Sequence, residues 1–464
     1  WFSVRWTLEM LTSMGRFKTV NYDAALNQTV TLDECLSPNH LARFVVQVVS
    51  LLDLSGIYAR YADVGGQAIA PEVLLGLLLY GYATGVFSSR KIEQATYESI
   101  PFRFIAGGLH PDHDTIANFR KSFLSEIKDL FAQVLLVAHQ SGLLKLGNIS
   151  IDGTKIHADA SKSHAVSYKH LLQLESRLRQ EVDELFTMAA QVDQTELPEG
   201  MGIADEIAFR EQRLANLAQA KQVLEARAQE RYELEQAEYK AKLRERERKA
   251  QETGRKPGGR PPEPPTPGPR DNDQYNFTDP ESRIMKNSNN EGFDQHYNAQ
   301  AVADHNSLLI VGNRLSNHPN DYGEAIPDLD AVPSGLGKPK AAALDYGFFS
   351  ALNIEQMEAR GIDPYIATGR EPHHRSWQEH FAAEPMPPPS DASPRVKMAY
   401  KLQTEIGKAI YRLRKCTVEP VIGIIKEVLG FRQFSLRGQK AAAGEWCLVC
   451  LAFNLKRLHV LMPA

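Results

Sequence analysis

The distribution of apolar positions divides the chain into a helical first part and a mixed second part. Apolar residues recur at helical spacing through residues 41–144, where Pro71 opens one apolar helix that runs to about Tyr82. A further predicted helix begins with Asp112 or Asp114 as its cap. One face of that helix carries the apolar residues Ile116, Phe119, Phe123, Ile127 and Leu130.

Basic residues lie near the N-terminal ends of these predicted helices, at Arg90, Lys91, Arg120 and Lys121. Several short helices with such charges could form a DNA-docking domain. An all-helical scaffold with solvated basic residues explains the same pattern equally well. Both interpretations stay open on the pattern alone.

Strand patterns begin at Ile149 and resume later in the chain. Residues 297–303 and 308–315 predict a hairpin with a short polar turn, and residues 341–345 and 364–367 predict two further strands. Helices are expected at residues 325–331 and 350–360, between and beside these strands. This alternation predicts an α/β protein with a mixed sheet flanked by helices.

A long polar section interrupts the strand pattern. Residues 168–249 are rich in Glu, Arg, Gln, Ala and Leu at spacings of three and four, which predicts one or two long helices that pair as a hairpin. Residues 254–270 form a Pro/Gly/Arg-rich linker that we expect to remain unpacked and mobile. Because strand signals resume afterwards, residues 165–270 are interpreted as an insertion of a helical arm and linker.

Two domains follow from this organisation: an all-helical N-terminal domain at residues 14–145, and a second domain at residues 146–460 that contains the insertion. Met14 is a more natural start than Trp1, so the preceding residues are left out of the fold prediction. At 464 residues and 51.9 kDa, the chain is long enough for domains with real cores.

Composition describes an ordinary soluble protein, with 43% hydrophobic and 24% charged residues. Four cysteines cannot form a disulfide framework at this length, which suits a reducing cytoplasm. The pair Cys447 and Cys450 lies in an apolar helix without a second pair, so we predict buried side chains rather than a zinc site. The apolar run at residues 73–87 is too short to span a bilayer, and no membrane partner is expected.

Positive charge is concentrated near the C-terminus, although the formal net charge of the chain is −4. From Lys397 onward the sequence has twelve Lys and Arg residues against four Glu, a local footprint for phosphate binding. A continuous helix there would place five charged residues on one face: Lys408, Arg412, Lys415, Glu419 and Lys426. Its apolar stripe would consist of Leu402, Ile406, Ile410, Leu413, Val421, Ile424 and Val428.

Pro420 predicts a kink in this helix, but the stripe continues past it, so one bent helix is expected. The simpler interpretation is a surface helix with intrahelical ion pairs such as Lys415 with Glu419.

Three widely separated carboxylates are the strongest candidates for chemistry. Asp152 and Asp345 each end a short apolar run and are followed by Gly, as expected where a buried strand leaves the sheet and turns. Either aspartate alone could simply cap a turn. Together with Glu419 they suggest a site for hard divalent cations, which prefer carboxylate oxygens and assist phosphodiester chemistry.

Several blocks of sequence resemble the bacterial insertion-sequence transposases with a DDE triad. They occur in order at residues 151–161 (IDGTKIHADAS), 292–293 (GF), 297–300 (YNAQ), 345–350 (DYGFFS) and 417–426 (TVEPVIGIIK), with a tail at Leu436–Gly438, Glu445–Trp446 and Asn454–Leu455. The resemblance extends from about Met14 to the C-terminus. It implies an RNase H-like catalytic core and an N-terminal helical DNA-binding region.

The resemblance also implies how such a protein works. Two Mg²⁺ ions, for which Mn²⁺ could substitute, would be held by Asp152, Asp345 and Glu419. The enzyme would cleave DNA at the terminal inverted repeats of an insertion sequence and transfer the strand to target DNA, as a homodimer on paired ends. It would act in the cytoplasm, in association with the nucleoid. An endonuclease that cuts without joining, and an inactive DNA-binding descendant, are the alternatives.

One signature departs from the family pattern. The related YREK signature has three residues between Arg and Glu, whereas four residues separate Arg414 from Glu419 here. Lys426 fits the final lysine, and either Arg414 or Lys415 fills the arginine place. The candidate DNA-binding residues are therefore Lys155, Arg412, Arg414, Lys415 and Lys426.

Overall fold

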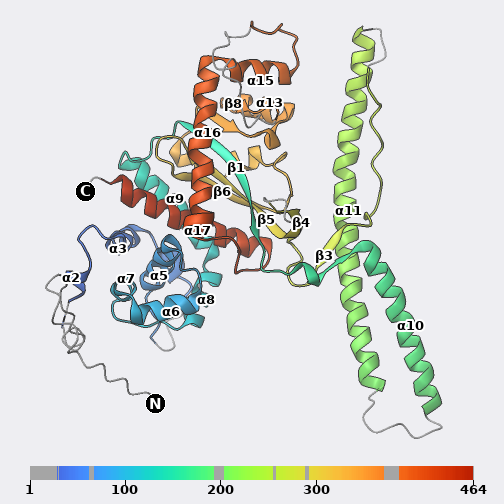
Figure 1. Ribbon diagram of the computed structural model, residues 1–464, viewed down its shortest axis with the longest axis horizontal. Coiled ribbons are helices and arrows are strands. Elements are labelled where there is room, and N and C mark those ends of the chain that lie inside the picture. Colours follow the sequence, from blue (N-terminus) through green and yellow to red (C-terminus); the bar gives the residue numbers. More distant parts are fainter. Residues whose placement is uncertain are drawn as a thin grey trace, which may run out of the picture.

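The computed structural model describes residues 29, 31–61, 67–192, 203–253, 258–287, 292–369 and 386–462. Its centre is a six-stranded mixed sheet (Figure 1), built from β1 (Asn148–His157), β4 (Arg283–Lys286), β5 (Phe293–Asp304), β6 (Ile310–Ser316), β7 (Ala341–Leu344) and β8 (Asp363–Ile366). Strand β1 pairs antiparallel with β5 and parallel with β7, and β7 pairs parallel with β8. The other edge of β5 pairs with β4 and then with β6.

The sheet confirms the predicted α/β class. The four strands predicted after the insertion are β5, β6, β7 and β8, and β5 begins four residues earlier than predicted, at Phe293. The predicted helices are α12 (Ala325–Asp330) and α13 (Ala351–Ala359), and short 3₁₀ turns lie at Ser334–Leu336 and Tyr346–Phe348. Strand β7 is buried along its whole length, which explains its unbroken apolar sequence.

Short helices form the part of the chain before β1. They are α2 (Leu32–Cys35), α3 (Leu41–Leu51), α4 (Ser55–Tyr58), α5 (Pro71–Thr84), α6 (Ser89–Glu98), α7 (Ile100–Ile105), α8 (His113–Ser122) and α9 (Leu124–Gln140). Asp112 caps α8 by accepting a hydrogen bond from the backbone nitrogen of Thr115 at 2.7 Å. The single long helix predicted from there is wrong, because Phe123 has non-helical dihedral angles that separate α8 from α9. Residues 14–28 of the predicted domain lie outside the described residues.

One of the basic residues offered as a DNA contact is unavailable. Arg120 is buried, and its guanidinium donates hydrogen bonds to the Tyr82 hydroxyl at 2.9 Å and to the Phe87 carbonyl at 3.1 Å. The prediction that Arg120 and Lys121 lie near the start of a helix is also wrong, because both lie in the last turn of α8. Nothing in the sequence indicated the burial of Arg120, since its partners come from other elements. Arg90, Lys91 and Lys121 are exposed.

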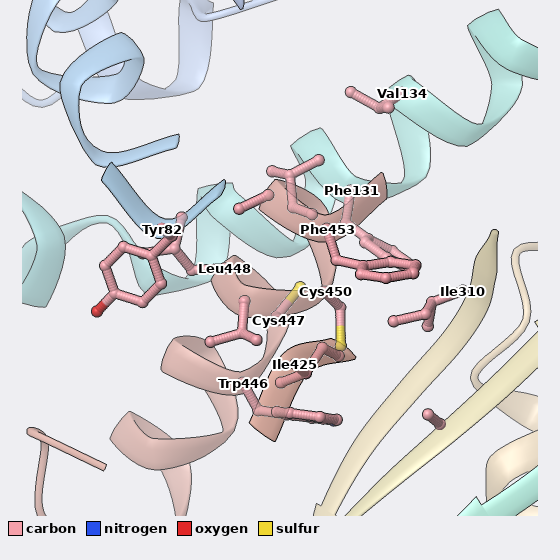
Figure 2. Packing of buried hydrophobic residues seen from close by; sticks show 14 of the residues in the cluster. Tyr82, Phe131, Val134, Ile310, Ile425, Trp446, Cys447, Leu448, Cys450 and Phe453 are labelled. Carbon is pink, nitrogen blue, oxygen red and sulfur yellow. The ribbon is translucent and has the colours of Figure 1, made fainter. Parts of the chain in front are cut away.

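The C-terminal helix α17 (Gln439–Leu461) joins the N-terminal helices to the sheet. It packs against α5 and α9 on one side and against β6 on the other, so a single hydrophobic core extends through both parts of the chain. Figure 2 shows Trp446, Cys447, Cys450 and Phe453 of α17 among side chains of α5, α9 and β6. Both cysteines are buried free thiols, which confirms the prediction that they pack as small apolar side chains.

The insertion is a helical hairpin that stands apart from the sheet (Figure 1). Helix α10 (Tyr168–Val192) packs against α11 (Ile203–Thr253), and a two-stranded sheet of β2 (Ala165–Ser167) and β3 (Gln274–Asn276) closes its base. Of the one or two long helices predicted here, the structure has two, and they pair as a hairpin. It has its own small core, separate from the main one, formed by Val166, Leu171, Leu178, Leu217, Ala220, Leu224 and Tyr275.

The expectation of an unpacked linker is wrong for residues 258–270, the part of it that the structure describes. Arg231 of α11 donates a hydrogen bond to the Gly268 carbonyl at 3.1 Å, and Arg246 donates to the Gly259 carbonyl at 3.3 Å. Arg270 forms an ion pair with Glu235 at 2.8 Å. Backbone carbonyls of this segment that make no regular secondary structure accept these hydrogen bonds from arginines of α11.

The basic C-terminal segment forms α15 (Pro394–Gln403), α16 (Glu405–Gly423) and a π-helical turn at Ile424–Val428. Pro420 lies inside α16, as predicted. The predicted apolar stripe is partly wrong, because Ile406, Leu413 and Val428 are exposed. The buried face instead carries Gly407, Arg414, Thr417, Val418 and Val421. Because arginine is polar, the spacing of apolar residues could not predict that Arg414 lies on the buried face.

Among the described residues, no single helix is long and apolar enough to span a bilayer, and only the bent pair α5 and α6 meets that length and composition together.

Candidate active site

The pairing of β1 with β7 places Asp152 and Asp345 at the same end of the sheet. Ile151 of β1 pairs in parallel register with Leu344, the last residue of β7. Asp152 and Asp345 directly follow the two members of this pair, so their backbones lie side by side where β7 ends. The Asp345 carboxylate caps the following 3₁₀ turn by accepting a hydrogen bond from the backbone nitrogen of Gly347 at 2.8 Å.

The structure corrects the interpretation of Gly153 as the start of a turn. Strand β1 continues to His157, so Asp152 lies within the strand rather than at its end. A Cβ atom at residue 153 would lie 2.5 Å from Asp321 Oδ1, 2.5 Å from Gln300 Nε2 and 2.8 Å from Asn298 Oδ1. Glycine is required here because other side chains approach the backbone closely.

Helix α16 crosses β1 and brings Arg414 and Glu419 to the same place. The Arg414 guanidinium lies 3.3 Å from Asp152 Oδ2 through Nη1 and 2.7 Å from Glu419 Oε1 through Nη2. The side chains of Arg414 and Asp152 are 11% and 18% exposed, whereas that of Glu419 is 44% exposed. Arg414 therefore connects the strand aspartate to the helix glutamate.

The other predicted DNA-binding residues differ in how deeply they are buried. Lys426, half-buried in the π-helical turn, donates hydrogen bonds to Thr154 Oγ1 at 3.2 Å and to the Lys155 carbonyl at 3.3 Å. Lys155 donates to the carbonyl of Lys286 at 3.0 Å. Arg412 and Lys415 are exposed on α16. Arg414, Lys155 and Lys426 thus lie at β1, with Arg414 in the interior.

Burial and mutual repulsion shape the charge of the carboxylates. Burial, followed by the negative charge of Asp345, raises the pKa of Asp152 to about 7, against the opposing effect of Arg414. Burial and then Asp321 raise the pKa of Asp345, which Arg414 again opposes. Burial lowers the pKa of Lys426. One guanidinium therefore does not compensate the negative charge gathered here.

This excess of buried carboxylate charge fits a divalent cation, because hard cations bind carboxylate oxygens and neutralise them. Asp152, Asp345 and Glu419 could supply those oxygens. Within the described ranges, however, no group of three or more His, Cys, Asp or Glu side chains already has a metal-binding arrangement. Arg414 lies between Asp152 and Glu419 and forms ion pairs with both. For Asp152 and Glu419 to bind the same cation, Glu419 has to give up its ion pair with Arg414.

Sequence reasoning gave no role in the site to three residues beside this group: Asp321, and Asn298 and Gln300 of the block at residues 297–300. Asp321 precedes α12, and its Oδ1 atom accepts hydrogen bonds from Asn298 Nδ2 and Gln300 Nε2, both at 2.7 Å. The two amides lie at alternate positions of β5, a spacing visible in the sequence that places both on one face of the strand. Asp321 itself lies in a polar loop that gave no signal.

Two family models match parts of the chain. A model described as "Transposase domain (DUF772)" matches residues 30–122, and one described as "Transposase DDE domain" matches residues 389–459. The first covers helices α2 to α8, and the second includes Glu419 and most of α17. Asp152 and Asp345 lie between the two matches.

The other comparisons add no relatives: no curated protein and no solved structure matches the chain. A DDE domain implies an RNase H-like fold, and the mixed sheet flanked by helices agrees with that class. Matches to transposase models before and after the strands of this sheet in the sequence support an insertion-sequence transposase of the DDE type.

Proposed function

We propose that this transposase cleaves DNA at the ends of its own element and joins the freed ends to target DNA. In this proposal Asp152 and Asp345 hold one divalent cation together, and Glu419 helps to hold a second. Mg²⁺ is the expected ion, and Mn²⁺ can replace it. The observation that carries the proposal is that β1, β7 and α16 bring together three carboxylates that lie far apart in the sequence.

The proposed reaction has two phosphoryl transfers. Water attacks a phosphodiester and releases a 3′-hydroxyl; that hydroxyl then attacks a target phosphodiester and releases a 3′-hydroxyl of the target strand. Each step forms one P–O bond and breaks one, so no energy-supplying cofactor is needed. When bound, divalent cations lower the pKa of the attacking hydroxyl group and stabilise the leaving oxygen.

The protein's own residues would position these reactants. Strands β1 and β7 hold Asp152 and Asp345 on a rigid sheet, which fixes their spacing. Arg414 holds Glu419 and Asp152 through charge-assisted contacts until the cation and DNA arrive. Exposed Arg412 and Lys415 on α16, with Lys155 and Lys426 beside β1, would contact DNA phosphates.

Two copies of the chain are proposed to act on paired ends of the element. The helical hairpin of α10 and α11 supports this because it projects away from the sheet, where it can reach a second copy or its DNA (Figure 1). At about 1.5 Å per residue, the helix Ile203–Thr253 is about 75 Å long. The N-terminal helices are proposed to bind the terminal repeats.

The test uses the full-length protein, Mg²⁺ and linear DNA that carries the nucleotide sequences flanking the gene. Joined products support the proposed function, whereas cleavage alone indicates a nuclease and binding alone indicates an inactive descendant. Asp345→Asn should remove both products. Asp330→Asn, an equal loss of charge at the exposed end of α12, should retain them.

A further inference from the structure

Asp321 is a fourth carboxylate beside the candidate active site. It lies in the loop between β6 and α12, far in sequence from Asp152, Asp345 and Glu419. Two buried amides on β5 hold it: Asn298 Nδ2 and Gln300 Nε2 both donate to its Oδ1 atom at 2.7 Å. This double contact fixes the orientation of the carboxylate.

The second oxygen of Asp321 lies beside Gly347, as does an oxygen of Asp345. A Cβ atom at residue 347 would lie 3.0 Å from Asp345 Oδ1 and 3.4 Å from Asp321 Oδ2, so both oxygens border the same small space. Asp321 Oδ2 accepts no hydrogen bond from any residue that the structure describes. Its Oδ1 atom lies against Gly153, on the face of β1 opposite to the Asp152 side chain.

Gln300 supplies an independent sign of a missing partner. Its side chain is fully buried, and its Oε1 atom has no hydrogen-bond partner within the part of the chain that the structure describes. The amide cannot satisfy Oε1 by flipping, because Nε2 must face the Asp321 carboxylate. A buried acceptor without a donor costs free energy, and a water molecule hydrating a nearby cation would supply the donor.

A purely structural role does not explain a carboxylate at this position. Asparagine could accept the same two hydrogen bonds at Oδ1 without bringing another negative charge to Asp345. A third aspartate beside two others is destabilising unless a cation balances it. A bound cation would explain three observations together: the free oxygen of Asp321, its negative charge beside Asp345, and the Gln300 oxygen that has no donor among the described residues.

We propose that Asp321 is a further cation-binding residue, which supplies a carboxylate oxygen on the Asp345 side of the site and is positioned by Asn298 and Gln300. This inference rests on the proposed function, because it concerns the same cations. It assigns roles to the two β5 amides as positioning residues. It also explains why residue 153 is glycine: any larger side chain would displace Asp321.

The test measures binding of Mn²⁺ alone to the full-length protein by electron paramagnetic resonance, without DNA. Asp321→Asn should weaken Mn²⁺ binding about tenfold, because it keeps the hydrogen bonds and removes the charge. Gln300→Met, which removes one of the two anchors at similar volume, should weaken binding by a smaller factor and serves if Asp321→Asn does not fold. Asp330→Asn is the matched control and should bind as the parent protein does.

Asp345→Asn separates this inference from the proposed function. Weaker binding in both Asp345→Asn and Asp321→Asn supports the assignment. If Asp345→Asn weakens binding while Asp321→Asn and Gln300→Met bind Mn²⁺ normally, Asp321 is not a cation-binding residue. If Asp345→Asn also binds Mn²⁺ normally, the proposed cation site itself is wrong.

Discussion

Replacing Asp152 by asparagine should stabilise the cation-free protein at neutral and alkaline pH. Burial and the charge of Asp345 raise the pKa of the Asp152 carboxyl from 3.8 to about 7 in the folded protein. The folded state therefore holds this proton more tightly than the unfolded state does. Ionisation of Asp152 reduces the free energy of unfolding progressively between pH 3.8 and about 7, and the loss is complete above that range.

The size of this effect follows from the pKa interval. At 1.36 kcal/mol for each pH unit, the interval from 3.8 to about 7 corresponds to about 4 kcal/mol. About 2 kcal/mol of it falls between pH 5 and 7, because the slope declines as the pH approaches the folded pKa. Asparagine carries no charge at any pH, so the free energy of unfolding of Asp152→Asn minus that of the parent should grow by about this amount over the range.

Urea unfolding of both proteins in EDTA at pH 5 to 8.5 measures this difference. Saturating Mg²⁺ should reduce the difference at pH 8 by stabilising the parent protein, since a ligand that binds only the folded state raises its stability. Asp330→Asn controls for the loss of one exposed negative charge. A difference that stays constant or shrinks as the pH rises would refute the electrostatic reasoning.

Three further predictions address the site and the arm. Asp345→Ala should abolish DNA cleavage while binding of end-containing DNA, measured by gel shift, stays largely intact; loss of binding would indicate a fold residue. Gly153→Ala should cost about 1–3 kcal/mol in urea unfolding, because its methyl group would overlap Asp321 and Gln300, and normal stability would contradict this packing. Replacing α10, α11 and the linker by a short turn between β2 and β3 should leave thermal unfolding of the main core intact, because the hairpin has a separate core, but should abolish paired-end complexes in gel shift.

Local patterns predicted the order of strands and helices well. Apolar residues recur every two positions in a strand and every 3.6 positions in a helix when one face of the element is buried. This spacing involves only nearby residues, so it can be recognised directly in the sequence. The break at Phe123 was missed because the apolar spacing continues across it, and all five stripe residues are buried despite the change of axis. The spacing of buried residues therefore does not show where one helix ends and the next begins.

The site was predictable only in part, for a different physical reason. Asp152, Asp345 and Glu419 were singled out as candidates because each follows or joins a recognisable block. Asp321 was not, because its position depends on two amides of β5 and on close approach to Gly153, contacts between distant segments. Gly153 itself was assigned to a turn, since glycine required for close packing and glycine required for a turn look alike in a sequence.

Glu445 explains how the N-terminal helices are fixed relative to the candidate active site. Its buried carboxylate accepts hydrogen bonds from the Tyr82 hydroxyl of α5 at 2.8 Å and from the backbone nitrogens of Ser435 and Leu436. Arg120 of α8 donates to the same Tyr82 hydroxyl. Removing one partner from such a buried charged network costs about 3–5 kcal/mol, so it holds these helices firmly to α17.

The next residue continues this connection to the sheet. Trp446 donates its indole hydrogen to the Gln300 carbonyl at 2.9 Å, and the side chain of Gln300 in turn holds Asp321. Consecutive residues of α17 thus link α5 and α8 to the strand beside β1. If the N-terminal helices bind the terminal repeats, this rigid connection fixes the distance along the DNA from the bound sequence to the phosphodiester at Asp152. The position of the cut would then be set by the fold, without any base-specific contact at the cleaved bond.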